Sequence, residues 1–442
     1  MHVSEDQLRD LGEDRLSLDD RRRVVRHLLT ACPSCLALAR RVLAPELESR
    51  VDYDGVLRRL GLAWVLARND VEVEKGIARA LWEGHLSRLE PGRRLMAIRR
   101  NPDLQTWGTF DLLVGESKRI ALERPVEAVD LAYAALAVTD LLDPRAYGEE
   151  RIQDYRASAW AVLANAKRLA GDFPGAREAL RTAAAKVDEG TGDPYEEANV
   201  LSMTASLLTD LGEFERAVDI LDRAVVLVRI VRDRPLEGRF RIHQSSTIGW
   251  SDPSRGLKLA ERGLRLLIRA QSGDKHTELG GRHLTALWSN ELGDFEEARS
   301  ILETYRPLYA SYPDATTQGR LLLLDALISR SEGRLEESER HLRRLVEHYS
   351  EHGMSFDLTL GTLEWAESLV LLGAHREATE VLSEVYPLIE QWGAPFDLLR
   401  SWKLMEEAVR GRAAQHGAFR ELAMRVRRLW WRGREGAVTP SA

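Results

Sequence analysis

A short turn phrase recurs along most of this chain and constrains its fold more than any other feature. The phrase runs glycine, any residue, an apolar residue, two polar residues and a small residue. Clear copies are GDFPGA (171–176), GEFERA (212–217), GDFEEA (293–298), GRLEES (333–338) and GAHREA (373–378), and weaker ones are LERPVEA (122–128) and SDPSRG (251–256). The closing small residues lie 48, 41, 39, 42, 40 and 40 residues apart. Units of this length cannot bury their apolar faces alone, so successive copies must stack.

Small residues also recur at fixed offsets from the closing residue of the phrase. They lie twelve residues before it at Ala164, Ala205, Ala286, Ala326 and Ala366, and seven residues after it at Ala135, Ala183, Ala224 and Gly263. Small side chains at these offsets let two antiparallel helices approach closely. The leading glycine can take the left-handed conformation that ends a helix. Leu and Ile at helical spacing fill the remaining positions, so the pattern predicts stacked helix pairs.

The pattern resembles that of tetratricopeptide repeats. The matching large and small positions are Trp160, Leu163, Ala164, Gly171, Phe173, Ala176, Leu180 and Ala183. The resemblance covers roughly residues 105–390 and implies an all-α solenoid, a right-handed superhelix of antiparallel helix pairs. Because the period exceeds the usual 34 residues by about six, we expect helices one to two turns longer.

The domain organisation follows from these repeats. We expect about seven helix pairs over residues 105–392, preceded by capping helices over 52–104. One or two closing helices are expected over 393–435, and a flexible tail over 436–442.

Both cysteines of the chain lie in one phrase, HLLTACPSC, as Cys32 and Cys35. His27 lies five residues before Cys32, and His2 lies 25 residues before His27. Two cysteine sulfurs with nearby histidine nitrogens make the mixed ligand set of tetrahedral zinc. Two other interpretations stay open: buried apolar cysteines, or a redox-active pair, although no thioredoxin-like strand and helix surround them.

The first 45 residues or so are similar to the zinc-binding domain of bacterial anti-sigma factors. That family has a histidine, a gap near 25 residues, and then His-x3-Cys-x2-Cys; here four residues separate His27 from Cys32. The resemblance implies a zinc module over residues 1–48 with His2, His27, Cys32 and Cys35 as ligands of a structural zinc. It also implies a helix over 36–43 that faces a sigma factor. In one variant of the family, oxidation of the thiolates releases both zinc and partner.

The repeat register predicts a binding face. In tetratricopeptide repeats the first helix of each pair lines the groove, which points a set of mostly polar side chains inward. They are Asn165, Arg168, Asn199, Ser202, Ser206, Arg241, Ser245, His283, Asn290, Arg320 and Arg330. Amide and guanidinium groups suit a peptide backbone or acidic side chains. The alternative is a solvated face without a ligand.

Two further clusters have a functional and a structural interpretation. His341, His348 and His352 share one helical face, which fits a metal site or the solvated edge of a repeat helix. Residues 410–434 hold eight arginines and one acid, with Trp430 and Trp431 among them. This segment suits an acidic partner, nucleic acid or a membrane surface, but a closing helix with solvated arginines is the favoured interpretation.

Composition limits the function classes. The 63 basic and 70 acidic residues give a net charge of −7, which argues against a general nucleic-acid binder. Two cysteines exclude a disulfide scaffold. No apolar run reaches the ~18–20 residues that span a bilayer, and the start lacks the apolar region of a signal peptide, so we expect a cytoplasmic protein without membrane contact.

No Walker A phrase, HExxH, GxSxG or Rossmann glycine phrase is present, so we expect a binding protein and not an enzyme. The sequence predicts a regulatory scaffold that holds a protein or peptide, with a sigma factor as the partner that the amino-terminal resemblance implies. The alternatives are a regulatory subunit of an effector enzyme such as a protease or toxin, and a sensor of a small peptide or metabolite.

Overall fold

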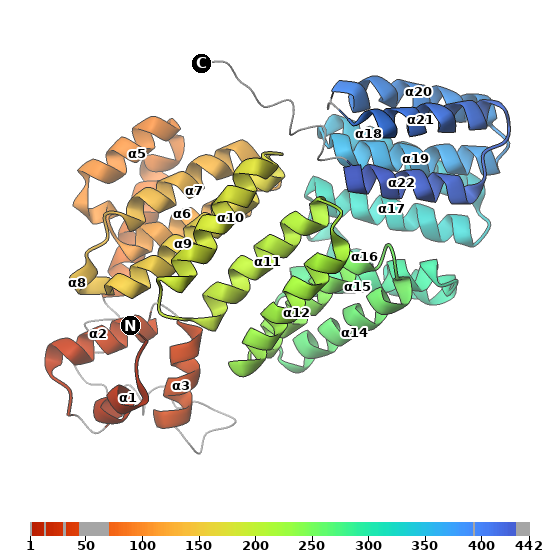
Figure 1. Ribbon diagram of the computed structural model, residues 1–442. Coiled ribbons are helices and arrows are strands. Elements are labelled where there is room, and N and C mark those ends of the chain that lie inside the picture. The colour runs from red at the N-terminus through yellow and green to blue at the C-terminus, as the bar shows by residue number, and fades with distance from the viewer. Residues whose placement is uncertain (1, 13–14, 30–31, 44–69, 392–393, 430–442) are drawn as a thin grey trace. The chain divides into compact units, whose positions relative to one another are not determined.

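The computed structural model describes residues 2–12, 15–29, 32–43, 70–391 and 394–429. Every regular element in these ranges is a helix, and none is a strand (Figure 1). The prediction of an all-α fold is confirmed. The chain divides into two compact units: unit 1 is Met1–Thr204 with Val226–Arg232, and unit 2 is Ala205–Val225 with Asp233–Ala442.

Unit 1 begins with three short helices around the two cysteines. They are α1 (Glu5–Gly12), α2 (Leu18–Leu29) and α3 (Pro33–Leu43). Helix α1 packs against α3. The buried side chains of Leu8, Leu11 and Val25 form one core with Cys32 and Cys35. The cysteines therefore belong to the hydrophobic centre of this small module.

The rest of unit 1 consists mainly of longer helices, with two short 3-10 helices, η1 and η2, and the four-residue α8 between them. Residues 70–84 are helical. They are followed by η1 (Leu86–Arg88), α5 (Pro91–Arg100), η2 (Pro102–Leu104), α6 (Trp107–Ile120), α7 (Pro125–Thr139), α8 (Pro144–Tyr147), α9 (Glu149–Leu169), α10 (Phe173–Asp188) and α11 (Pro194–Asp210). The pairs α6 with α7 and α9 with α10 pack closely, and α7 also packs on α9. Each pair thus stacks on the next.

Unit 2 continues the same arrangement. Its helices are α12 (Phe214–Ile230), α13 (Arg234–Ile248), α14 (Pro253–Arg269), α15 (Lys275–Glu291), α16 (Phe295–Ala310), α17 (Ala315–Ser331), α18 (Leu335–Glu351), α19 (Ser355–Leu371), α20 (His375–Gln391), α21 (Phe396–Arg410) and α22 (His416–Leu429). The division between the units falls within α11 and α12. From α13 to α21, helices that are neighbours in the chain pack against each other.

The leading glycines of the turn phrase adopt the left-handed conformation that the sequence predicts. Its five leading glycines all have positive φ values, between 72° and 89°: Gly171, Gly212, Gly293, Gly333 and Gly373. At the first of these turns, the amide of Asp172 donates to the carbonyl of Lys167 at 2.8 Å, which satisfies a carbonyl at the helix end. A side chain with a β-carbon is strained in this conformation, so glycine is the residue that ends the first helix.

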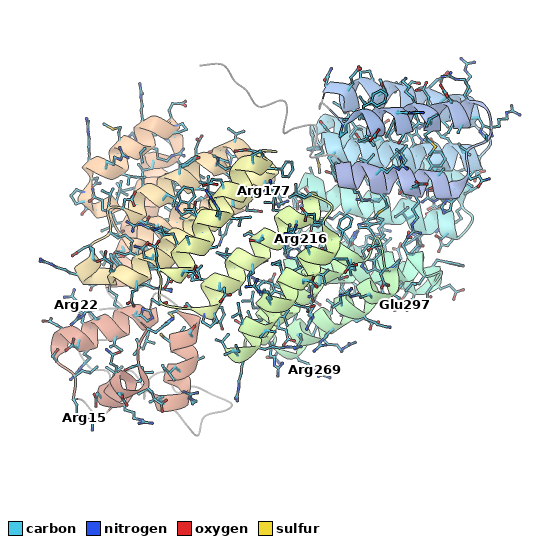
Figure 2. All side chains as sticks on the ribbon, in the orientation of Figure 1. Arg15, Arg22, Arg177, Arg216, Arg269 and Glu297 are labelled. Carbon is cyan, nitrogen blue, oxygen red and sulfur yellow. The ribbon has the colours of Figure 1, made fainter. Side chains whose placement is uncertain are left out.

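The residue after the turn glycine often begins the second helix. Asp172 and Asp294 follow such glycines, and Asp252 follows Ser251 in a weaker copy of the phrase; each accepts a hydrogen bond from a backbone amide three residues on, at 2.8, 3.2 and 2.9 Å. Such caps satisfy amides that have no partner within the helix. Figure 2 labels charged side chains on these second helices, all exposed: Arg177 on α10, Arg216 on α12, Arg269 on α14 and Glu297 on α16.

The small residues lie where helices touch. Ala176, Ala217, Ala298 and Ala378, which close the phrase, are fully buried. A β-carbon on Gly263 of α14 would lie 2.7 Å from the carbonyl oxygen of Gly238 in α13. Any larger residue there would force α13 and α14 apart.

Some expectations fall outside the described residues. These are the flexible tail over 436–442, the tryptophans at 430 and 431, and residues 52–69 of the capping segment. The proposed limits of the domains remain predictions. Among the described residues, no helix combines the length and the apolar character that crossing a membrane requires.

Candidate functional site

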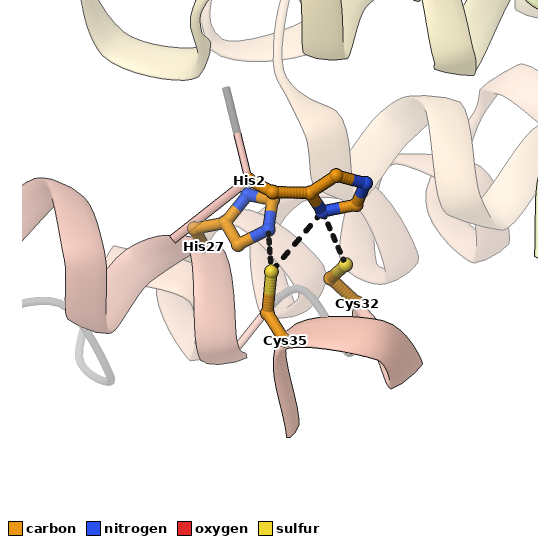
Figure 3. Close-up of side chains that lie close together, drawn as sticks. All are labelled: His2, His27, Cys32 and Cys35. Carbon is orange, nitrogen blue, oxygen red and sulfur yellow. Dashed lines mark hydrogen bonds between the residues drawn. The ribbon is translucent and has the colours of Figure 1, made fainter. Parts of the chain in front are cut away.

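Four side chains with metal-binding atoms converge in the amino-terminal module (Figure 3). His2 Nδ1 lies 3.1 Å from Cys35 Sγ and 3.6 Å from Cys32 Sγ. His27 Nε2 lies 3.2 Å from Cys35 Sγ. One donor atom from each of the four residues falls within 4.8 Å of all the others. In a tetrahedron with metal–ligand bonds of 2.0–2.3 Å, ligand atoms lie about 3.3–3.8 Å apart, so the cluster has the composition and nearly the size of a zinc site.

Local structure brings the four residues together. His2 comes just before α1, whose start is fixed by a reciprocal pair: Gln7 N donates to Ser4 Oγ at 3.1 Å, and Ser4 N donates to Gln7 Oε1 at 2.9 Å. His27 lies in the last turn of α2. Cys32 and Cys35 lie at the start of α3, where backbone amides favour negative charge.

The environment of the two sulfurs favours one thiolate. Both cysteines are almost inaccessible. The interaction with Cys32 lowers the pKa of Cys35, and the backbone amide of Val3, 3.3 Å away, contributes in the same direction. The interaction with Cys35, together with burial, raises the pKa of Cys32 to about 12. A divalent metal would supply the positive charge that lets both sulfurs ionise.

The loop between α10 and α11, which is distant in sequence, contacts two residues of the cluster. His2 Nε2 lies 2.9 Å from Thr191 Oγ1, whose hydroxyl donates to Asp154 Oδ2 at 2.6 Å. The Cys32 thiol donates to Asp193 Oδ2 at 3.2 Å, and the Ser34 hydroxyl donates to Asp193 Oδ1 at 2.6 Å. The contact between Thr191 and His2 is of the kind that orients a metal ligand, whereas the hydrogen bond from Cys32 to Asp193 belongs to the protonated sulfur. The loop between α10 and α11 thus joins the small module to the repeat within unit 1.

Buried charges support the loop. Arg151 Nη1 lies 3.0 Å from Asp154 Oδ2 and 3.5 Å from Asp193 Oδ2, and all three side chains are at most 5% exposed. Burial raises the pKa of the neighbouring Glu196 to about 7, despite the attraction of Arg151. The pKa of Asp193 is lowered, since hydrogen bonds from Ser34 and the Tyr195 amide outweigh its burial.

A cavity of about 250 Å³ adjoins the two histidines. Its lining includes Arg23 and Arg26 of α2 and Tyr147 at the end of α8. The histidine side of the cluster therefore borders this cavity.

Sequence reasoning did not find Asp154, Thr191 or Asp193. Asp193 lies in the phrase TGDP before α11, which looks like an ordinary helix start. The one related feature of the sequence is Gly190, because a β-carbon there would lie 2.1 Å from Asp154 Oδ1. The need for glycine at this position becomes apparent only from the three-dimensional structure.

The residues predicted for the binding face all lie on first helices of pairs. Arg320 of α17 is exposed, and Asn165, Arg168 and Asn199 are half-buried. The buried members are Ser202, Arg241, Ser245, His283 and Asn290. Ser206 of α11 and Arg330 of α17 are half-buried.

Several buried members hold neighbouring helices together. Arg241 Nη1 donates to Gln244 Oε1 at 2.7 Å and lies 3.1 Å from Asp222 Oδ1. His283 Nδ1 lies 2.9 Å from the Tyr309 hydroxyl, and burial lowers the pKa of His283 to about 3, so this imidazole is neutral. The exposed and half-buried members are the ones that can meet a ligand.

His341 and His348 of α18 and His352, which follows it, are not brought into a metal-binding group; the cluster at His2 is the one group that could hold a metal in the described part of the chain. His348 Nε2 lies 2.8 Å from the Ala315 carbonyl, and His352 Nδ1 lies 2.8 Å from the His348 carbonyl. These contacts are those of a repeat helix at its solvated edge.

Comparison with known proteins gives fold neighbours only. No protein-family model matches the chain. No curated protein matches it by sequence. Among solved structures, the chain is similar to a Rap protein complexed with competence and sporulation factor, with 11% identity and a TM-score of 0.56 over 72% of this chain and 87% of that one. It is also similar to aspartyl phosphate phosphatase F from Bacillus subtilis, with 12% identity and a TM-score of 0.50 over 85% and 93%.

A third structure, a signal-transduction ATPase with a tetratricopeptide repeat sensor from Pyrococcus horikoshii, has 15% identity and a TM-score of 0.43 over 84% of this chain and 53% of that one. The first two neighbours agree with a helical-repeat fold of the tetratricopeptide type. At such low identity, the likeness extends to the fold alone.

Proposed function

We propose that this protein is a cytoplasmic regulatory binding protein, in which a zinc module is joined to a helical repeat that holds a protein or peptide. One observation carries the proposal: His2, His27, Cys32 and Cys35 converge, and a loop of the repeat contacts two of them. A metal there would hold the small module together, and the contacts of His2 with Thr191 and of Cys32 with Asp193 would connect the module to the binding repeat.

The zinc would have a structural role. Four protein ligands fill a tetrahedral site, so no position remains for substrate. The ligands come from the segment before α1, from α2 and from α3, and the bound ion would cross-link all three. Because such sites do not exist in the unfolded chain, the binding free energy would contribute to folding.

Metal analysis tests this part. Protein purified under reducing conditions should contain about one equivalent of zinc, and Cys32→Ser with Cys35→Ser should contain almost none. His352→Ala, which alters a histidine outside the cluster, is the matched control and should keep its zinc. Less than about half an equivalent in the unaltered protein would contradict a zinc module.

The repeat would bind its partner on the first-helix face. In unit 1, Asn165, Arg168 and Asn199 offer amide and guanidinium groups that are not fully buried, and these suit a peptide backbone or acidic side chains. Arg320 offers an exposed guanidinium on a first helix of unit 2. The similar Rap structure is a complex with competence and sporulation factor, which supports a binding role for a repeat of this fold. Asn199→Ala combined with Arg168→Ala should weaken partner binding, and unchanged affinity would count against this face.

A sigma factor is the partner that we propose first, bound through the module and its helix α3. Co-purification followed by mass spectrometry tests the choice. A sigma-like protein that is lost on Cys32→Ser with Cys35→Ser supports it. Recovery of a protease or toxin instead would favour regulation of an effector enzyme, and recovery of a small peptide or metabolite would favour a sensor.

We propose binding and not catalysis as the activity. One similar structure is named as an aspartyl phosphate phosphatase, so this choice needs a direct test. The purified protein should not accelerate loss of phosphate from a phosphoaspartyl protein, and a rate increase would overturn the choice.

A further inference from the structure

The last described helix, α22, packs differently from the helices that precede it in unit 2. From α13 to α21, helices that are neighbours in the chain pack against each other. Helix α22 packs on α21, but it also turns back onto α19 (Figure 1). Helix α19 is the first helix of its pair, so α22 lies on the side where the repeat register places the binding face.

One side of α22 is apolar and buried. Phe419, Leu422 and Val426 are at most 3% exposed. They belong to a core that also contains Leu363 of α19 and Met405 of α21. These residues recur at intervals of three and four, which makes α22 an amphipathic helix docked by its apolar stripe.

Beside this stripe, basic groups of α22 reach first helices of other pairs. Arg420 Nη1 lies 3.3 Å from Glu291 Oε2 at the end of α15. The guanidinium of Arg427 lies 4.1 Å from the centre of the Trp250 ring, just after α13.

His416 at the start of the helix completes these contacts, since its Nδ1 pairs with Glu367 Oε1 of α19. One short helix therefore contacts residues from three helix pairs of unit 2: α13 with α14, α15 with α16, and α19 with α20.

The surface under α22 is acidic and incompletely filled. Glu364 and Glu367 of α19 lie 2.7 and 2.9 Å from Arg330 of α17. Glu291 also interacts electrostatically with Arg330, so three carboxylates of this surface act on one arginine that is not part of α22. A cavity of about 60 Å³ remains, lined by Trp250, these carboxylates and α22. The surface can therefore accept cationic groups from another helix.

We infer that this surface, formed by Trp250, Glu291, Glu364 and Glu367, is a docking site for an arginine-bearing amphipathic helix of a partner protein, and that α22 is its occupant within the chain. The inference deepens the proposed binding function, since it names the chemistry of one partner segment. A partner helix with the same pattern of apolar residues and arginines binds by displacing α22.

Because α22 already occupies the surface, a partner helix must compete with α22 to bind. A tethered helix competes at an effective concentration of the order of millimolar. The apparent affinity of a partner is reduced in proportion to the fraction of molecules in which the surface is open. Weakening α22 must therefore tighten the binding of an external helix.

A labelled peptide of residues 414–429 is the probe, and the full chain is the receptor. Arg420→Glu with Arg427→Ala in the chain removes two contacts of α22 but leaves its apolar stripe. This variant should bind the peptide at least about tenfold more tightly than the unaltered chain. Arg425→Glu is the control, because Arg425 contacts Glu421 and Ser401 and not the acidic surface; it should bind like the unaltered chain.

Two further measurements separate docking from misfolding. Adding Glu291→Gln to the double variant should weaken peptide binding again. Isotope-labelled peptide should increase hydrogen exchange in α22 of the unaltered chain, because docking displaces it. Equal binding to the double variant and the unaltered chain, no binding to either, or docking without faster exchange in α22 would each overturn the inference. None of these outcomes depends on zinc or on the natural partner, so they stand apart from the tests of the proposed function.

Discussion

At the scale of single residues, the hydroxyl of Thr191 is the outer contact that best explains how His2 is oriented. It donates to Asp154 and so accepts from His2 Nε2, which leaves His2 Nδ1 facing the sulfurs. Thr191→Val keeps the shape and removes this contact, and it should weaken zinc binding by about 10- to 100-fold in competition with a chelator. Thr182→Val on α10, whose hydroxyl bonds to the Glu178 carbonyl, is the matched control. Equal affinities for both variants would contradict the role of Thr191.

His283 gives a pH-dependent prediction at the same scale. Burial lowers its pKa to about 3 in the folded chain, whereas the unfolded chain has the ordinary value near 6.5. The unfolded state therefore binds more protons below pH 6.5, and stability falls as the pH falls from 6.5 towards 3. Lowering the pH from 7 to 5 should cost about 2 kcal/mol through this residue. The free energy of unfolding of His283→Gln, measured in urea, should lack this contribution to its pH dependence. If the variant and the unaltered protein show the same pH dependence, His283 does not contribute to it.

Residue identity predicts the cluster that could hold a metal better than it predicts the binding face. His2, His27, Cys32 and Cys35 could be proposed because few residue types bind zinc. Polar side chains such as Arg241 and His283 are less informative, because the same groups that can bind a peptide can also bond Asp222 or Tyr309 of a neighbouring helix. Burial decides between these roles, and it depends on packing that a register alone does not define.

At the scale of helices, close contact between α13 and α14 depends on glycine. Gly263→Ala would place a β-carbon 2.7 Å from the Gly238 carbonyl oxygen, and it should destabilise unit 2 by about 1–3 kcal/mol. Gly280→Ala on α15 meets no atom within 4 Å and should instead stabilise by up to about 1 kcal/mol through helix propensity. Denaturant midpoints measure both changes. A similar increase in stability for both variants would show that α13 and α14 can move apart without loss of stability.

The helix ends were predictable because the turn phrase carries their chemistry. Gly171 and Gly293 end first helices with positive φ values, and Asp172 and Asp294 cap the second helices. The return of α22 onto α19 was not predictable from this phrase. Its arginines alone fit a solvated closing helix equally well, and only the positions of Glu291 and Trp250 show where they bind.

At the scale of the whole molecule, the division into two units separates the metal cluster from most of the repeat. The cluster and its outer contacts at Thr191 and Asp193 belong to unit 1. A bound ligand stabilises the state that binds it by an amount that grows with its concentration relative to Kd. Removing zinc with a chelator should therefore increase hydrogen exchange in α1 to α3 and in the loop between α10 and α11, and leave exchange in α15 to α20 unchanged. The Cys32→Ser, Cys35→Ser variant should already show the faster exchange, and the chelator should add nothing to it. Faster exchange throughout α15 to α20 would instead mean that the two units unfold as one.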